Sequence, residues 1–249
     1  MGTRRTRRFW LCWALALAVT AVWTISASHV QTSQPVGGAA HGSYVALTFD
    51  DGPWPGTTNA LLDGLAQRGV KATFFLVGEQ VADRAETVRR MADEGHQIGL
   101  HTWHHVSLKG MTPDQITSQL DQTCAAIREI VGPVDLMLRP PYGFVDDTLR
   151  QWAKAPIICW SLDTEDWKDP TPSRITADIL RQVKDGDIIL MHDIFDTSVT
   201  AALAAVDQLL AQGYQLVTVE ELFAQRGQDP QPGAVYCSLP PAQKEEVEP

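Results

Sequence analysis

Short apolar runs alternate with amphipathic stretches through the middle of the chain. Runs with the length and composition of buried strands lie at residues 44–49, 71–77, 96–101, 135–140, 156–162, 187–192 and 214–219. Stretches with helical spacing lie between most of them, at 57–68, 79–94, 113–130, 146–154, 173–184 and 198–211. Repeated β-α units with short connections predict an α/β fold with parallel strands and right-handed crossovers. Seven such strands favour a barrel over an open sheet, and the pattern leaves closure undecided.

The two ends of the chain differ from this middle part. Residues 1–27 hold four arginines and no acid, followed by an apolar stretch and small residues. This layout predicts an export signal, or a membrane anchor if it is not cleaved. Either segment places the rest of the chain outside the cytoplasm. Residues 28–41 are polar and Gly-rich, so we expect a linker, a domain at 42–226, and a Pro- and acid-rich tail at 227–249.

The net charge restricts the class of binding partner, and the cysteine content restricts the disulfides that the chain can form. Loss of residues 1–27 would remove four arginines and change the formal net charge from −10 to −14. Such an acidic body repels phosphates, which argues against nucleic acid or anionic lipid as a partner. Beyond Cys12 the chain has Cys124, Cys159 and Cys237. One disulfide is allowed in an oxidising compartment, the pair is undetermined, and three buried thiols are the alternative.

Reactive side chains collect where the expected strands end. Asp50 and Asp51 follow the first run, and further clusters lie at residues 99–105, 138–143, 161–167 and 190–193. Because the carboxyl ends of parallel strands meet at one rim, these clusters should converge on a single cleft. Five clusters on one rim are hard to explain by solubility or packing, so we expect a functional site there.

The spacing within this rim suggests a metal site beside a base. His101 and His105 are four residues apart and, with one carboxylate, would give three ligands and an open position for a divalent metal. The metal would relieve the repulsion between Asp50 and Asp51, and the second carboxylate would act as a base. Solvated or core histidines and a pair of helix-capping carboxylates are the alternatives. The spacing does not decide which aspartate has which role.

The remaining rim residues suggest supporting roles. Arg139, between an apolar run and two prolines, is expected to pair with a carboxylate, and Asp166 could complete an Asp-Arg-Asp network. Trp167 would be either an exposed aromatic wall or a core residue. His192 ends a very apolar run, where a histidine is often structural. Facing a metal and a base, it would be the general acid.

Five of these stretches together resemble a known family. The ordered motifs TFDDGP, HTWHH, RPPYG, DTEDW and LMH are similar to those of polysaccharide deacetylases of carbohydrate esterase family 4, the NodB homology domain, across about residues 42–226. The chain departs from the family at Leu100 and Val106, where many relatives have Asn and Pro. The resemblance implies a distorted (β/α) barrel with seven or eight mostly parallel strands.

The resemblance also implies roles for individual residues. Asp50 would be the general base, and the metal, Zn²⁺ or another divalent ion such as Co²⁺, would bind Asp51, His101 and His105. Further roles would fall to Arg139, which orients the base, Asp166, which holds Arg139, the Tyr142 backbone N–H at the oxyanion, Trp167 and Leu190 at the acetyl pocket, and His192 as the acid.

The implied activity is metal-dependent removal of N-acetyl groups from a polysaccharide that contains N-acetylglucosamine, either peptidoglycan or a chitin-type oligomer. An O-acetyl esterase acting on acetylxylan and a non-catalytic sugar-binding domain are the alternatives. The expected partner is an acetylated polysaccharide or oligosaccharide. We expect a monomer that contacts a membrane only through the N-terminal segment, if that segment is an anchor.

Overall fold

The computed structural model describes residues 42–242. The expected export segment 1–27, the linker 28–41 and the end of the expected tail at 243–249 lie outside the described residues. Within residues 42–242, no helix has both the length and the hydropathy needed to span a membrane.

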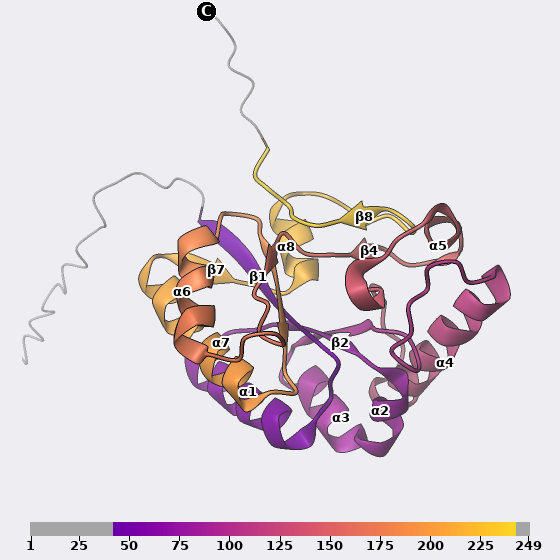
Figure 1. The fold of residues 1–249 in the computed structure, drawn as a ribbon, viewed down its shortest axis with the longest axis horizontal. Helices are drawn as coiled ribbons and strands as arrows, with labels where there is room; N and C mark the ends of the chain where they lie inside the picture. The colour runs from indigo at the N-terminus through magenta and orange to yellow at the C-terminus, as the bar shows by residue number, and fades with distance from the viewer. Residues whose placement is uncertain (1–41, 243–249) are drawn as a thin grey trace, which may run out of the picture. The chain divides into compact units, whose positions relative to one another are not determined.

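A parallel sheet forms the centre of this part of the chain (Figure 1). Its strands lie in the order β3-β2-β1-β6-β5, and β7 pairs with the first residues of β1. The strands are β1 (Ser43–Asp50), β2 (Thr73–Leu76), β3 (Gln97–Leu100), β5 (Leu162–Asp163), β6 (Ile188–His192) and β7 (Tyr214–Leu216). Because they run in parallel, the predicted rim residues at their carboxyl ends are brought to the same edge.

The strand predicted at 135–140 is wrong in its extent. Only Leu138 takes part in the sheet, through parallel bridges to Leu100 and to Ile157. Pro140 and Pro141 follow soon after Leu138, and because proline has no N–H to donate, they cannot extend a hydrogen-bonded ladder. A single bridged residue therefore occupies the place of a strand.

The run predicted as one strand at 156–162 changes partner along its length. Its first part, β4 (Ile157–Ile158), pairs with β8 (Val235–Tyr236), and its end leads into β5, which pairs with β6. The chain thus connects the Leu138 side of the sheet with the β6 side. This confirms the predicted α/β fold, a distorted barrel in which all pairs between named strands are parallel.

Helices α1 to α7 cover the outside of the sheet (Figure 1). Neighbours pack in the order α6, α7, α1, α3, α4 and α5. Thr112 caps α4, since its hydroxyl accepts the Gln115 N–H while the Gln115 side chain accepts the Thr112 N–H. The helix predicted at 79–94 is divided at Arg84, which has non-helical dihedrals. The helices are α1 (Pro55–Arg68), α2 (Gly78–Asp83), α3 (Ala85–Asp93), α4 (Pro113–Val131), α5 (Asp147–Trp152), α6 (Pro172–Gln182) and α7 (Asp196–Ala211).

Alternation along β1 creates two apolar layers. Val45, Leu47 and Phe49 belong to a core that includes residues of the outer helices. Ala46, between them, belongs to a second core inside the barrel. Side chains on one strand alternate between faces, so Thr48 and Asp50 point to the same interior as Ala46. The interior layer leads directly to the rim where the predicted base lies.

A helix that the sequence pattern did not predict plugs the opposite end of the barrel. In α8 (Val219–Gln225), Val219, Leu222 and Phe223 pack into the interior core. Thr218 and Glu221 form a capping box at its start. The Thr-x-x-Glu pattern of residues 218–221 therefore indicates a helix start in the sequence, but it overlaps the strand-like run at 214–219.

The tail predicted from residue 227 begins too early. Residues 235–236 form β8, and Leu239 is only 2% exposed in the interior core. The Leu239 backbone is also hydrogen-bonded to the domain, since its N–H donates to the Gly186 carbonyl and its carbonyl accepts from Nε of the Arg226 side chain. Single apolar residues placed on an existing sheet edge leave no periodic pattern, which is why composition alone indicated a tail.

Buried His96 should make the fold sensitive to acid. Burial lowers the pKa of its imidazole from 6.5 to about 4, and its Nδ1 accepts the Ala72 N–H at 3.1 Å. The unfolded state therefore binds more protons as the pH falls from 6.5 toward 4, and stability is lost across that window. Between pH 7 and pH 5, urea denaturation should show the wild type losing about 2 kcal/mol more than His96→Gln. Equal losses in the two proteins would contradict this.

Candidate active site

Asp51, His101 and His105 meet at the rim as predicted. One ligand atom from each lies within 4.8 Å of the others. Asp51 Oδ1 is 3.3 Å from Nε2 of His101 and 3.1 Å from Nε2 of His105. Asp51 directly follows β1 and has a φ of 73°, which turns it away from the strand direction. The left-handed turn lets two adjacent aspartates face different partners.

This group fits a divalent metal. Asp51 Oδ1 is buried and has no hydrogen-bond partner. Nδ1 of His101 lies 2.7 Å from the Arg139 carbonyl oxygen, an arrangement that directs Nε2 toward Asp51. Burial alone would raise the pKa of Asp51, but the adjacent imidazoles of His101 and His105 outweigh it and hold that pKa well below its usual range. Two imidazoles and one carboxylate are a donor set that zinc and cobalt accept.

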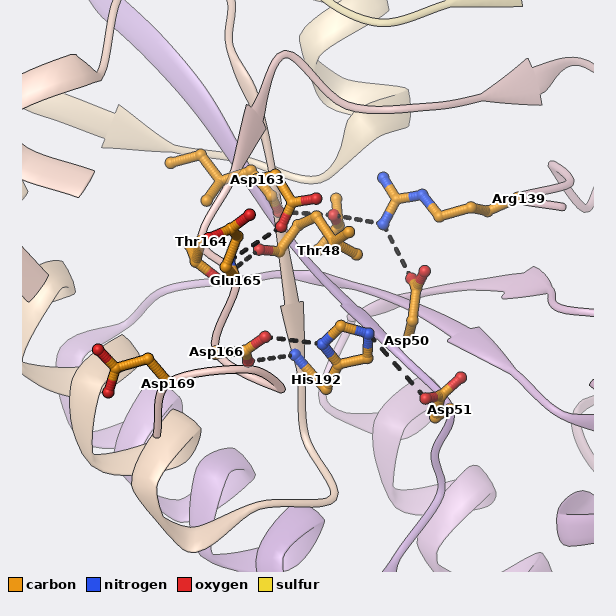
Figure 2. A network of polar contacts seen from close by, with 12 residues as sticks. Thr48, Asp50, Asp51, Arg139, Asp163, Thr164, Glu165, Asp166, Asp169 and His192 are labelled. Atoms are coloured by element: carbon orange, nitrogen blue, oxygen red, sulfur yellow. Dashed lines mark hydrogen bonds and ion pairs between the residues drawn. The ribbon is translucent and has the colours of Figure 1, made fainter. Parts of the chain in front are cut away.

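Asp50 has a different environment from Asp51. Asp50 is 4% exposed, and its Oδ1 accepts a hydrogen bond from Arg139 Nη1 at 2.8 Å. The same Nη1 donates to Thr48 Oγ1 at 2.7 Å. The guanidinium lies 4.2 Å from the Phe75 ring centroid inside the barrel. Arg139 is thus fully buried and fixed, and it offsets the charge of Asp50 (Figure 2).

The predicted contact between Asp166 and Arg139 is wrong. Asp166 instead holds His192, accepting from its backbone N–H and pairing with its Nδ1, each at 2.8 Å (Figure 2). Arg139 takes carbonyl partners in that place, Ile158 through Nε at 3.2 Å and Cys159 through Nη2 at 3.0 Å. The Asp-Arg-Asp network therefore separates into two pairs, one for each side of the cleft.

His192 lies across the cleft from the aspartates. Register pairs it with Asp50 on the neighbouring strand, so both side chains face the barrel mouth. Burial lowers the pKa of the imidazole, but Asp166, Asp50 and Asp51 together raise it to about 9. For Asp166 burial alone would raise the pKa, but the interactions with His192 outweigh burial and lower that pKa. His192 is consequently a cation at neutral pH and can donate a proton.

A cleft of about 440 Å³ contains these groups. Tyr142 and Trp167 stand at its edge with 60% and 58% exposure, and Leu190 lies deeper at 5%. Of the two alternatives left open for Trp167, the structure thus has the exposed wall of the cleft and not the core residue. Sequence reasoning missed Trp160 and Phe195, because nothing separates them from ordinary strand and loop residues, and it gave Asp163, within the rim cluster 161–167, no role. The full lining is Asp50, Asp51, His101, His105, Tyr142, Trp160, Asp163, Trp167, Leu190, His192 and Phe195.

Two further residues, to which the sequence interpretation gave no role, support the loops of the site. Gln119 of α4 accepts the N–H groups of Trp103 and His104 at 2.9 and 3.1 Å, which fixes the loop before His105. Asp193 is completely buried next to the Gly52 backbone and accepts the Thr58 hydroxyl. Burial raises the pKa of Asp193 to about 7. His104 itself is exposed and takes no part in the metal group.

Comparison with known proteins decides the family. A family model described as polysaccharide deacetylase matches residues 37–156. A peptidoglycan-N-acetylglucosamine deacetylase of Bacillus cereus is 37% identical over 186 residues, which cover 72% of this chain and 68% of that protein. The chain belongs to the polysaccharide deacetylase family. This confirms the resemblance stated from the motifs.

Other members of the polysaccharide deacetylase family extend the comparison. The peptidoglycan-N-acetylmuramic acid deacetylase PdaC of Bacillus subtilis is 43% identical over 178 residues, 72% of this chain. The chain spans only 38% of the length of PdaC. A family 4 acetyl xylan esterase from Clostridium thermocellum, solved in complex with a cobalt ion, is 35% identical with a TM-score of 0.76. That comparison covers 79% of this chain and 99% of the solved one.

Proposed function

We propose that this polysaccharide deacetylase family member hydrolyses N-acetyl groups on a polysaccharide that contains N-acetylglucosamine, of peptidoglycan or chitin type. The observation that carries the proposal is the division of the rim into three units with unlike partners. Asp51 faces two histidines, Asp50 faces Arg139, and His192 faces Asp166. A ligand group, a base and an acid around one cleft are what amide hydrolysis requires.

We further propose that the enzyme depends on a divalent ion, zinc or cobalt, held by Asp51, His101 and His105. Such an ion supplies Lewis acidity that polarises the acetyl carbonyl and activates water. The relative from Clostridium thermocellum was solved with cobalt, which supports the donor set. Consistent with the N-terminal pattern, we propose that the enzyme works outside the cytoplasm. We also propose that it is a monomer.

The protein's own residues divide the remaining work. Asp50, fixed by Arg139, accepts a proton from the water that attacks the carbonyl carbon. The Tyr142 N–H stabilises the oxyanion of the tetrahedral intermediate, and Trp167 and Leu190 hold the acetyl methyl group. Protonated His192 donates to the leaving nitrogen, which would otherwise depart as an unstable amide anion.

Acetate release, measured side by side on peptidoglycan, chitopentaose and acetylxylan, tests the substrate class. Release from peptidoglycan or chitopentaose supports the proposal. Release from acetylxylan alone would favour the esterase alternative, which the relative from Clostridium thermocellum motivates. An ester leaving group needs less protonation, so an esterase should depend weakly on His192. A protein that binds all three polymers and releases no acetate would be a sugar-binding domain.

Metal removal should abolish activity. After treatment with a chelator and desalting, we expect acetate release to fall below one hundredth of the untreated value, because the carbonyl and the water lose their activation. Added zinc or cobalt should restore it. The same chelation should leave the circular dichroism spectrum unchanged, since the surrounding loops are held by groups such as Gln119. Hydrolysis that survives chelation would contradict the metal mechanism.

Asp166→Asn should move the alkaline limb of activity to lower pH. Activity needs protonated His192 and falls as the pH rises through its pKa of about 9, which the Asp166 carboxylate helps to raise. Without that charge the limb in kcat/KM against pH should shift down by about one unit. Asp169→Asn, which removes an exposed carboxylate on the same segment, is the control and should leave the limb in place. An unshifted limb in Asp166→Asn would refute His192 as the acid.

A further inference from the structure

Two cysteines that the mechanism does not use lie opposite each other beside the barrel. The parallel pairs Ile157–Val235 and Ile158–Tyr236 put Cys159 and Cys237 next in register. The Cys159 N–H donates to the Tyr236 carbonyl at 2.8 Å, so the ladder continues to this point. Opposed residues on neighbouring strands have Cα atoms about 5 Å apart and side chains on one face, within the range that a disulfide spans.

The two thiols also differ in accessibility. Cys237 is exposed and Cys159 is half-buried. Burial, together with the charge and the hydrogen bonding of the Cys237 thiol, raises the pKa of Cys159 to about 11. Cys237 is therefore the thiol that a reagent in solution meets first. Cys124 lies on α4 and is not part of the β4–β8 strand pair.

We propose that Cys159 and Cys237 form an intramolecular disulfide that ties β8 to β4. The oxidant is a small-molecule or protein disulfide. Cys237 attacks one of its sulfurs, forming a mixed disulfide and releasing one thiol. Cys159 then displaces the second thiol and closes the Cys159–Cys237 bond. Two protein thiols are oxidised, and the two electrons and two protons reduce one disulfide to two thiols.

This cross-link would secure a segment that holds the catalytic base in place. The carbonyls of Ile158 and Cys159 accept bonds from Arg139, whose Nη1 holds Asp50. Beyond β8, Leu239 fills the interior core. The bond closes a loop of roughly 80 residues, long enough for a large effect on the unfolded chain. It therefore links the stability of the C-terminal segment to the geometry behind Asp50.

The test uses the full chain, reduced with dithiothreitol, desalted and then exposed to oxidised glutathione. Of the four thiols, two should disappear, and non-reducing peptide mapping should recover the peptides of Cys159 and Cys237 joined. The melting temperature of the monomer should rise by about 5–10 °C on oxidation. The rise should persist in Cys124→Ser and vanish in Cys237→Ser, an exposed change that leaves the core intact.

Four results would overturn the proposal. Three are retention of all four thiols after oxidation, glutathione left on Cys237 without closure, and a rise in melting temperature that survives in Cys237→Ser. The fourth is a disulfide-linked dimer through Cys237 on a non-reducing gel. None of these readouts involves acetate release, so a failed disulfide and a failed enzyme assay are distinguishable.

Discussion

Replacing Asp50 with Asn should lower kcat on an acetylated chito-oligomer by about 10²–10⁴-fold, the usual contribution of a positioned base. Asn has the same shape and can still accept the hydrogen bond from Arg139, but it cannot take a proton from water. Asp51, His101 and His105 keep their arrangement in this variant. Metal content, measured by atomic emission on the purified protein, should therefore equal that of the wild type.

Asp51→Asn is the matched comparison, because it makes the same chemical change one residue further on. Asp51 Oδ1 faces both imidazoles, and a neutral amide is a much weaker ligand. We expect this variant to lose most of its metal, and excess zinc should restore part of its activity. Metal loss in Asp50→Asn with retention in Asp51→Asn would show that the two roles are exchanged.

The contrast between these aspartates shows what sequence could and could not supply. The motif and the resemblance assigned one carboxylate to the metal and one to the base. The physical cause appears only in the structure. Asp50 is the last residue of β1 and keeps the inward direction of Thr48, whereas the positive φ of Asp51 turns it toward the histidines. A left-handed residue next to Gly-Pro can be suspected from sequence but its direction cannot.

Register explains why one pairing was predicted incorrectly. Parallel strands bring Asp50 opposite His192 and Asp163 opposite Leu190, and Asp166 follows Asp163 on the His192 side of the cleft. The spacing of apolar runs in the sequence indicates where the strands are but not their order in the sheet. It therefore could not show whether Asp166 would reach Arg139 or His192. The periodic outer elements were predictable from their patterns. Elements defined by one or two residues, such as β8, depend on tertiary contacts and were not.

Replacing Arg139 with Met should be among the most destabilising single changes in the protein. The guanidinium is fully buried and bonds Asp50, Thr48 and two backbone carbonyls. Met fills similar volume but leaves the Asp50 carboxylate buried and unpaired, which costs about 3–5 kcal/mol. Urea denaturation at pH 7 measures the change. Arg128→Met, which removes an exposed guanidinium bonded to the Val134 carbonyl, should change stability by about 0.5 kcal/mol or less.

A double variant separates the charge from the packing. If the unpaired carboxylate causes the loss, Arg139→Met combined with Asp50→Asn should recover about 1–3 kcal/mol relative to Arg139→Met alone, because the amide is cheaper to bury than the ion. If the loss came only from the carbonyls of Ile158 and Cys159 that no longer receive a donor, the second change would recover nothing. Recovery therefore identifies Arg139 as the counter-ion that lets a charged base exist inside the barrel.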